Sequence, residues 1–198
     1  MERIHAKKIF EHNAGDHVAR YIWAHNKLVG KTTLDCGCGE GYGTAWLRDH
    51  GIDIVGLDCS RQALLSSKMK DLFLADILSI PVTGNSFDAI ISFEVIEHLE
   101  DGNNYLSDIC NILSPAGVFI GSTPIRKPRK YKNEHPKNPY HKKEYYIEEI
   151  NGLLKKYFKE VTLYGQIFPS TVGIIFLSQF YKLKVLKKQQ TFYPVHSR

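Results

Sequence analysis

Acidic residues and glycines alternate in a short stretch near the start of the chain, and this arrangement is suited to binding a nucleotide-like ligand. Asp35 follows an apolar run, and Gly37, Gly39 and Gly41 come after it at every second position. With so few side chains in the turn, a ligand can lie against backbone N–H groups and the positive end of the helix that follows. Asp58 ends the next apolar run, about 20 residues beyond the glycines, where the ribose-binding acid of a nucleotide-binding βαβ unit lies. The sequence therefore predicts a nucleotide-cofactor site.

The spacing of the glycines favours one cofactor over others. The dinucleotide fingerprint G-x-G-x-x-G fails because Tyr42 or Thr44 stands where its third glycine belongs. The sequence contains no G-x-x-x-x-G-K-[ST] motif, so a P-loop is not predicted. An acid at the end of the strand would repel a pyrophosphate but attract a cation. S-adenosylmethionine has an ammonium, a sulfonium and two ribose hydroxyls but no phosphate, and it fits this pattern.

With these residues the chain resembles the class I S-adenosylmethionine-dependent methyltransferases, and the resemblance extends over about residues 32–123. Residues 57–60 (Leu-Asp-Cys-Ser) are similar to the second motif, whose acid binds both ribose hydroxyls. Residues 74–77 (Leu-Ala-Asp-Ile) are similar to the third, which contacts the adenine. Residues 87–99 resemble the fourth strand with the segment beyond it, and residues 113–120 resemble the turn into the fifth strand.

The resemblance implies a cofactor contact for each of several residues. These are Asp35, Gly37, Gly39 and Gly41 for the methionine end, Asp58 and Cys59 for the ribose, Asp76 and Ile77 for the adenine, and Phe93 beside the sulfonium. Two of the acids also have a simpler structural interpretation: Asp58 as a helix N-cap, although Ser60 is better placed, and Asp76 as the cap of a turn. The three acids in matching contexts together favour the cofactor.

Two carboxylates and an imidazole lie close together beyond the predicted fourth strand. Glu94, Glu97 and His98 would share one face of a helical turn, because positions i, i+3 and i+4 do. With His135 or His141 they would be able to hold a divalent metal ion, and this set resembles that of the metal-dependent 2′-O-methyltransferases acting on small-RNA 3′ ends and of ubiquinone-pathway O-methyltransferases. Such segments are also widespread in class I enzymes that use no metal, so we assign no metal ligand. A packed, hydrogen-bonded His98 is the simplest interpretation, and as the catalytic candidate His98 would be a general base or a residue that positions the acceptor.

The elements that must position these residues alternate along the chain. Apolar runs predict strands near residues 32–36, 52–57, 71–75, 87–92, 116–122 and 161–164, and we assign 171–178 as a strand rather than the start of a helix. Helical spacing predicts helices near residues 15–28, 42–50, 61–69, 101–113 and 144–158. We therefore expect an α/β fold with a doubly wound, Rossmann-like class I methyltransferase sheet. It should be mostly parallel, with six or seven strands and the ligand at the carboxyl ends of the strands.

The composition is that of a single domain without membrane-spanning or disulfide-rich character. The chain has 198 residues and 43% hydrophobic residues, and the apolar run near its end, residues 173–177, is too short to span a bilayer. Its four cysteines form no C-x-x-C pair, and its first residues lack the pattern of a signal peptide. We expect one methyltransferase domain over residues 1–198, located in the cytoplasm.

Basic residues are concentrated between residues 124 and 143. This segment has eight Lys or Arg and one Glu, a net charge of +7, whereas the whole chain has +5, so the remainder is slightly acidic. Four prolines predict a loop, and it follows the fifth strand at the ligand-binding edge. It is either a solvated flap or a lid that covers the cofactor and recruits an anionic or polyhydroxyl acceptor. Residues 182–198 begin with a second basic cluster.

Taken together, these features predict methyl transfer from S-adenosylmethionine to an oxygen, or as second choice a nitrogen, of a small or sugar-like acceptor. Residues 138–146, 157–161 and 164–166 are similar to small methyltransferases of surface-polysaccharide and other secondary pathways, which favours a carbohydrate or small-metabolite acceptor. Two alternatives stay open. One is an RNA methyltransferase whose basic segments track phosphates. The other is a non-catalytic partner subunit that binds the cofactor.

Overall fold

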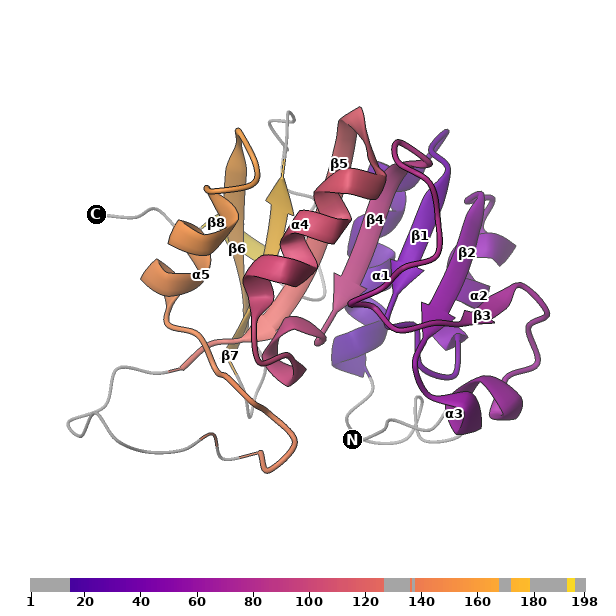
Figure 1. Cartoon of the computed structure of the whole chain (residues 1–198), viewed down its shortest axis with the longest axis horizontal. Coiled ribbons are helices and arrows are strands. Elements are labelled where there is room, and N and C mark those ends of the chain that lie inside the picture. The colour runs from indigo at the N-terminus through magenta and orange to yellow at the C-terminus, as the bar shows by residue number, and fades with distance from the viewer. Residues whose placement is uncertain (1–14, 127–135, 137, 168–171, 179–191, 195–198) are drawn as a thin grey trace.

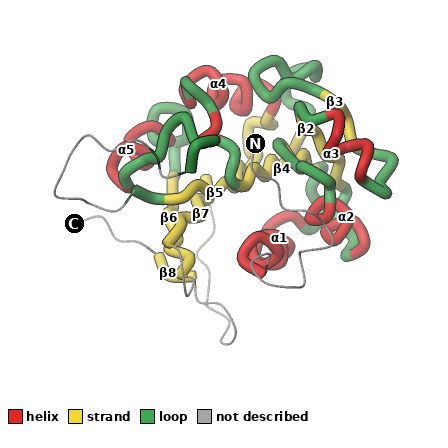
Figure 2. The backbone as a smooth tube through the Cα atoms, turned by 90° about the horizontal axis from the view of Figure 1, so that it is seen from below, coloured by secondary structure: helices red, strands yellow, loops and turns green. Residues whose placement is uncertain are grey.

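A computed structural model of the chain describes residues 15–126, 136, 138–167, 172–178 and 192–194. They form a β-sheet with helices on both faces (Figures 1 and 2). The strands are β1 (Thr33–Cys36), β2 (Ile54–Asp58), β3 (Leu72–Leu74), β4 (Phe87–Phe93), β5 (Leu113–Pro124), β6 (Val161–Ile167), β7 (Val172–Ser178) and β8 (Phe192–Pro194). The helices are α1 (Gly15–Leu28), α2 (Tyr42–Asp49), α3 (Arg61–Ser66), the 3-10 turn η2 (Ile96–His98), α4 (Gly102–Ile112) and α5 (Ile147–Leu154).

The order of the strands determines where a ligand can bind. The order across the sheet is β3-β2-β1-β4-β5-β7-β6-β8. β1 to β5 pair in parallel, and β7, β6 and β8 extend the sheet with antiparallel pairs. The chain winds outward from β1 in one direction and from β4 in the other. The carboxyl ends of these two neighbouring strands therefore meet at the switch point where ligands bind in open α/β sheets.

Two apolar cores hold the helices to the sheet, one on each face. α4 and α5 contribute to the core that contains Ile90 of β4, whereas α1 and α2 contribute to the core that contains its neighbours Ala89 and Ile91. Successive residues of a strand point to opposite faces, so a strand covered on both faces needs apolar side chains at nearly every position. This requirement explains why the parallel strands were recognisable as continuous apolar runs.

The predicted succession of elements is confirmed, with three differences. The sheet has eight strands rather than six or seven, because the three-residue β8 pairs with β6. The helix expected over residues 144–158 spans only Ile147–Leu154: Tyr145 bridges to Ile125, and the Glu149 carboxylate then accepts a hydrogen bond from the Tyr146 N–H (2.9 Å) at the start of the helix. α3 ends at Ser66 rather than near residue 69, because the next residue is extended. The assignment of residues 171–178 as a strand agrees with β7.

The two basic segments predicted from the sequence fall largely outside the described residues. Of the loop at 124–143, the structure describes residues 124–126, 136 and 138–143, and of residues 182–198 it describes only β8. His135, one of the two loop histidines considered as a ligand, also lies outside. Among the described helices, none has the length and apolarity that crossing a membrane requires.

Candidate functional site

The turn between β1 and α2 has three glycines in the left-handed region, at φ +86°, +58° and +73° for Gly37, Gly39 and Gly41. A Cβ added to Gly37 would lie 2.5 Å from the Val95 side chain, and one added to Gly41 would lie 2.5 Å from that of Leu72. A Cβ added to Gly39 would meet no atom within 4 Å. Gly37 and Gly41 therefore allow close packing within the protein, whereas Gly39 borders open space that a ligand can occupy.

Asp35 lies within β1, immediately before this turn, and is completely buried. Its Oδ2 accepts hydrogen bonds from the hydroxyls of Thr44 (2.7 Å) and Tyr21 (3.2 Å). Its Oδ1 is buried and has no hydrogen-bond partner in the described structure. Burial raises the pKa of Asp35 to about 7, and the charge of Asp58 acts in the same direction. A cation next to this carboxylate would compensate for its desolvation.

Asp58 joins the glycine turn to the loop that follows β2. Its Oδ2 accepts a hydrogen bond from the Gly39 N–H (2.8 Å), and its Oδ1 accepts one from the Ser60 N–H (2.7 Å). The N-cap of α3 is Ser60, whose hydroxyl accepts from the Ala63 N–H (3.2 Å). The interpretation of Asp58 as a helix cap is therefore wrong. The Asp58 carboxylate still has capacity to accept hydroxyl groups, since two carboxylate oxygens offer about four acceptor positions. The next residue, Cys59, is exposed.

The third predicted segment lies beside the second but has a local role of its own. The Ala75 N–H donates to the carbonyl of Asp58 (3.2 Å), which holds the end of β3 next to the end of β2. Asp76 is exposed, and its Oδ1 accepts from the Leu78 N–H (2.9 Å), so it caps a turn. Ile77 packs against the core under α4 and α5. The structure brings the three motifs to one edge of the sheet.

α1 contributes to this edge as well, although none of the site residues predicted from the sequence lies on it. The Tyr21 ring packs edge-on against Phe93, at the end of β4, with centroids 5.0 Å apart, and lies 5.8 Å from the ring of Tyr42 at the start of α2. Its neighbour Arg20 is 4% exposed. A detectable signal was present: Arg20 and Tyr21 precede Ala24, a buried core residue one helical turn later. A cation at such a position is unusual.

At the end of β4, Glu94 has a left-handed backbone with φ +57°, which a residue with a long side chain rarely adopts. Its N–H donates to the carbonyl of Ser122 on β5 (3.0 Å), and the Ser122 hydroxyl donates to its carboxylate (2.9 Å). Such conformations persist where the surrounding structure holds them, and they are concentrated at functional sites. The Glu94 side chain belongs to the same edge of the sheet as the glycine turn.

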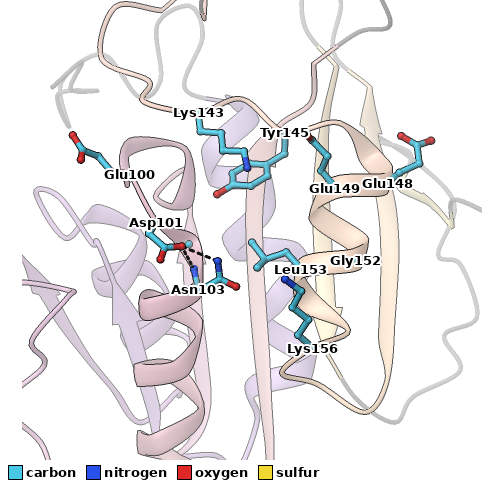
Figure 3. Close-up of a pocket in the computed structure, with 11 residues that line it drawn as sticks. Glu100, Asp101, Asn103, Lys143, Tyr145, Glu148, Glu149, Gly152, Leu153 and Lys156 are labelled. Atoms are coloured by element: carbon cyan, nitrogen blue, oxygen red, sulfur yellow. Dashed lines mark hydrogen bonds between the residues drawn. The ribbon is translucent and has the colours of Figure 1, made fainter.

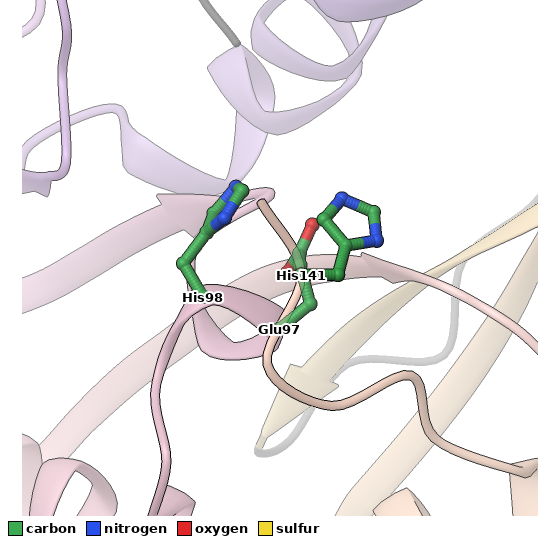
Figure 4. Close-up of side chains that lie close together, drawn as sticks. All are labelled: Glu97, His98 and His141. Carbon is green, nitrogen blue, oxygen red and sulfur yellow. The ribbon is translucent and has the colours of Figure 1, made fainter. Parts of the chain in front are cut away.

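Glu97, His98 and His141 form a compact group beyond β4, and one donor atom from each lies within 4.8 Å of the others. Figure 4 shows the Glu97 carboxylate between the two imidazole rings. Glu97 is fully buried; one of its oxygens accepts from the Thr123 hydroxyl (3.0 Å), and the other has no partner in the described residues. Burial raises the pKa of Glu97 well above its ordinary value, and the charge of Glu94 adds to the effect.

The two histidines are held by different neighbours. His98 Nδ1 lies 2.9 Å from the Tyr140 carbonyl, so Nδ1 is the nitrogen that carries the proton in the neutral ring. His141 contacts Glu144 through Nδ1 and Asn138 through Nε2, both at 3.1 Å. Two imidazoles and a carboxylate suit a transition-metal ion, and a carboxylate behind a metal-binding histidine is common. The same contacts also satisfy His141 without a metal.

A polar pocket of about 380 Å³ opens between the start of α4 and α5 (Figure 3). It begins at Glu100, two residues after His98, and contains none of the predicted cofactor residues. Its lining carries both charges and neutral hydrogen-bonding groups, among them Asp101, Asn103, Lys143 and Glu149. Asp101 is engaged as the N-cap of α4 and accepts from the Asn103 N–H (2.8 Å).

Comparison with known proteins connects this geometry to one family. Residues 34–121 match the model of a methyltransferase domain. A probable S-adenosylmethionine-dependent methyltransferase of Mycolicibacterium smegmatis is 31% identical over 143 residues, which cover 70% of this chain and 56% of that protein. A ubiquinone biosynthesis O-methyltransferase of Ruegeria pomeroyi is 28% identical over 120 residues, covering 57% of this chain and 48% of that protein.

Solved structures show the same fold. The crystal structure of a SAM-dependent methyltransferase from Archaeoglobus fulgidus superimposes with a TM-score of 0.69 at 15% identity, covering 87% of this chain and 97% of that one. The chain spans about half the length of the curated relatives it matches.

Proposed function

Because the chain carries a methyltransferase domain of the class I, S-adenosylmethionine-dependent family, we propose that it transfers a methyl group from S-adenosylmethionine to a hydroxyl of a small-molecule or sugar-like acceptor. The observation that carries the proposal is the pair of buried acids, Asp35 and Asp58, around the open backbone at Gly39. This arrangement matches a ligand that is cationic at one end and has vicinal hydroxyls in its middle.

Each predicted contact has a physical basis in the residues themselves. The unpartnered oxygen of Asp35 offers a negative charge to the ammonium group, and Asp58 offers acceptor positions to the ribose hydroxyls. Ile77, next to Asp76, offers apolar surface to the adenine. Phe93, at the end of β4, is placed to contact the part of the cofactor around the sulfonium. When bound, the cofactor supplies a methyl group activated by a sulfonium, which a nucleophile displaces without a covalent enzyme intermediate.

His98 is the residue that we propose to take the proton from the acceptor hydroxyl. Its Nδ1 is fixed by the Tyr140 carbonyl, which leaves a lone pair at Nε2 in the neutral ring. A histidine is suited to this task because its ordinary pKa lies close to neutrality. Holding the hydroxyl in line with the methyl group would supply most of the acceleration.

The polar pocket beside η2 supports a hydroxylated acceptor. Its acids, lysines and amide offer both donors and acceptors, as a sugar or a related metabolite requires. The ubiquinone biosynthesis relatives are named O-methyltransferases, which supports an oxygen nucleophile. The described part of the basic segment, residues 138–143, is tied to η2 through the N–H groups of Lys142 and Lys143, which donate to the Glu97 carbonyl (2.8 and 3.0 Å).

Calorimetry tests the cofactor half of the proposal. S-adenosylhomocysteine is titrated into the wild-type protein, into Asp58→Ala and into Asp49→Ala, a control that removes an exposed acid at the end of α2. We expect binding by the wild type and the control and loss of binding in Asp58→Ala, because the variant removes the ribose acceptor. Equal affinities in all three proteins would contradict the site. Methyl transfer to a panel of sugars and phenols, compared between the wild type and His98→Gln, then tests the acceptor half.

The group Glu97, His98 and His141 favours a second candidate function, a metal-dependent RNA 2′-O-methyltransferase. These three side chains would hold a divalent ion, whose chemistry is to lower the pKa of a bound hydroxyl. Titration with Mn²⁺, with Glu97→Gln as the test and the exposed Glu100→Gln as its control, decides whether an ion binds there. The second function would be favoured over the first if the wild type and Glu100→Gln bound Mn²⁺ stoichiometrically, Glu97→Gln did not, and the wild type methylated an RNA oligonucleotide. Binding of S-adenosylmethionine without turnover on any acceptor would favour a non-catalytic partner subunit.

A further inference from the structure

We propose that β3 pairs antiparallel with β3 of a second copy of this chain, about a two-fold axis at Phe73, so that two sheets join edge to edge. β3 is at one end of the strand order and, among the described residues, pairs with a strand on one side only. Figure 1 shows it on the opposite side of the sheet from β8. An edge strand presents unpaired N–H and C=O groups that another chain can pair with. This inference goes beyond methyl transfer and does not depend on it.

The hydrogen bonds between β3 and β2 show which backbone groups face the free side. The Asp71 carbonyl accepts from the Gly56 N–H (3.2 Å), and the Ala75 N–H donates to the Asp58 carbonyl (3.2 Å). Backbone groups of successive residues in a strand alternate between its two sides. Residues 71, 73 and 75 therefore direct these groups towards β2, and Leu72 and Leu74 direct theirs towards the free side.

Exposed apolar side chains are concentrated around this edge. Five of the eight large apolar side chains that are exposed in the described part of the chain lie within residues 65–82. They are Leu65 of α3, Phe73 and Leu74 of β3, and Leu78 and Val82 of the segment that follows, each at least 40% exposed. α3 contacts β3, and the segment continues directly from it. Concentrated apolar exposure of this kind marks an interaction surface.

The sequence around β3 is complementary to itself when it is read in opposite directions. In an antiparallel pair centred on Phe73, Leu72 of one copy lies opposite Leu74 of the other, and the two exchange backbone hydrogen bonds through their outward groups. Lys70 then lies opposite Asp76, and both are exposed. Opposite charges in facing positions stabilise a strand pair. A two-fold axis repeats every contact, so the apolar pair and the charged pair each occur twice.

Other centres of symmetry lose this complementarity. A pair centred on Leu72 would place Lys70 opposite Leu74, and one centred on Leu74 would place Asp76 opposite Leu72. Each of these arrangements sets a charge against an apolar side chain, whose desolvation carries a cost. The match of charge and apolarity within one short segment therefore favours a second copy over an unrelated extended peptide, and it specifies the register.

The alternative is that β3 stays unpaired, because short length and flanking charges also protect edge strands from association. The two interpretations differ in what a charge reversal does. Charges that only protect the edge can be reversed without changing the association state. Charges that pair across the two-fold axis cannot be reversed singly, because each reversal places like charges opposite each other twice.

The experiment measures the association of this chain by sedimentation velocity between about 1 and 300 µM. Because the paired strands are short, we expect a dimer of the wild type with a dissociation constant of about 1–100 µM. Lys70→Glu and Asp76→Lys should each raise this constant by about 10- to 100-fold. Lys155→Glu makes the same charge change at an exposed residue after α5 and should leave the constant unchanged.

Mixing the two charge-reversed variants tests the register. Fluorescently labelled Lys70→Glu should sediment as a monomer alone and as a dimer after equimolar Asp76→Lys is added, because both facing positions then again carry opposite charges. Lys155→Glu added in the same amount should not rescue the dimer.

A cross-link at the two-fold axis gives a second measurement, which needs neither charge variant to fold. Facing residues that exchange no hydrogen bonds have Cα atoms about 4.5 Å apart, within the range of a disulfide. Phe73→Cys should therefore form a covalent dimer in oxidised glutathione, beyond the background of the wild type with its exposed Cys59.

Three results would overturn the inference. A wild type that stays monomeric at every concentration would leave β3 an unpaired edge. A dimer that Lys70→Glu does not weaken, or that the mixture of variants does not restore, would be formed by another surface or register. Cross-linking of Phe73→Cys no greater than that of the wild type would exclude the two-fold axis at this residue.

Discussion

Replacing one glycine of the β1–α2 turn by alanine separates its packing role from its binding role. Gly39 and Gly51 have left-handed backbones, at φ +58° and +82°, and a Cβ on either would meet no atom within 4 Å. An L-residue in the left-handed region costs about 1–2 kcal/mol. Both alanine variants should therefore lose about this much stability, which lowers the melting temperature by about 2–4 °C for each kcal/mol in a protein of this size.

Binding should distinguish the two variants, because only Gly39 borders the proposed cofactor site. Its N–H donates to Asp58, and a methyl group at its Cα would occupy space next to that contact. Overpacking a filled site costs about 1–3 kcal/mol. This corresponds to a loss of about 5- to 150-fold in affinity for S-adenosylhomocysteine.

The assay combines thermal unfolding of the ligand-free proteins with calorimetric titration of S-adenosylhomocysteine. Gly51→Ala is the matched control, since it has the same strain and the same open surroundings in the turn between α2 and β2. Equal affinity in the two variants would refute the assignment of the space at Gly39 to a ligand. A stability loss at Gly39 much larger than at Gly51 would show that the open surroundings were misjudged.

Three further predictions concern charge, a buried hydrogen bond and packing. Because burial raises the pKa of Asp35 to about 7, the affinity for S-adenosylhomocysteine should increase from about pH 6 to about pH 8 as the carboxylate ionises, and calorimetry of Asp35→Asn should show no such increase. In the ligand-free protein, the raised pKa of Asp35 contributes stability that is fully present below pH 3.8, the pKa of this group in the unfolded chain, and that is lost as the pH rises through about 7. The free energy of unfolding of Asp35→Asn, measured by urea titration, should lack this decline with pH. Tyr105→Phe removes the hydroxyl that donates to buried Ser92 (2.6 Å), so it should lower the free energy of unfolding by about 1–3 kcal/mol. The affinity for the ligand should be unchanged. An unchanged urea midpoint would contradict the hydrogen bond. Phe119→Ala removes a ring that is 1% exposed and stacks on Phe158, with ring centroids 5.5 Å apart, and it should lower the free energy of unfolding by about 3–5 kcal/mol in the same titration. A loss below about 1 kcal/mol would mean that the core is not closely packed at this position.

Several features of the site and of the fold could not be predicted from the sequence. The three glycines of the turn have the same spacing and similar backbones, so only their neighbours Val95 and Leu72 distinguish the packed positions from the open one. β8 was missed because a three-residue edge strand carries no periodic pattern. The start of α5 was misplaced because Tyr145, whose spacing fits the helix, bridges to a strand instead.

By itself, the sequence determined the α/β succession and the acid-and-glycine motif, because both depend on local signals. Strands covered on both faces are apolar at successive positions, and a turn that approaches a ligand must be free of side chains. Only the tertiary structure decided which distant residues meet. Arg20 contacts Gln166 across 146 positions, and His98 approaches His141 only because the segment after β5 returns to η2 through hydrogen bonds to the Glu97 carbonyl. These long-range contacts depend on how the sheet and its loops pack together, and no local sequence pattern specifies them.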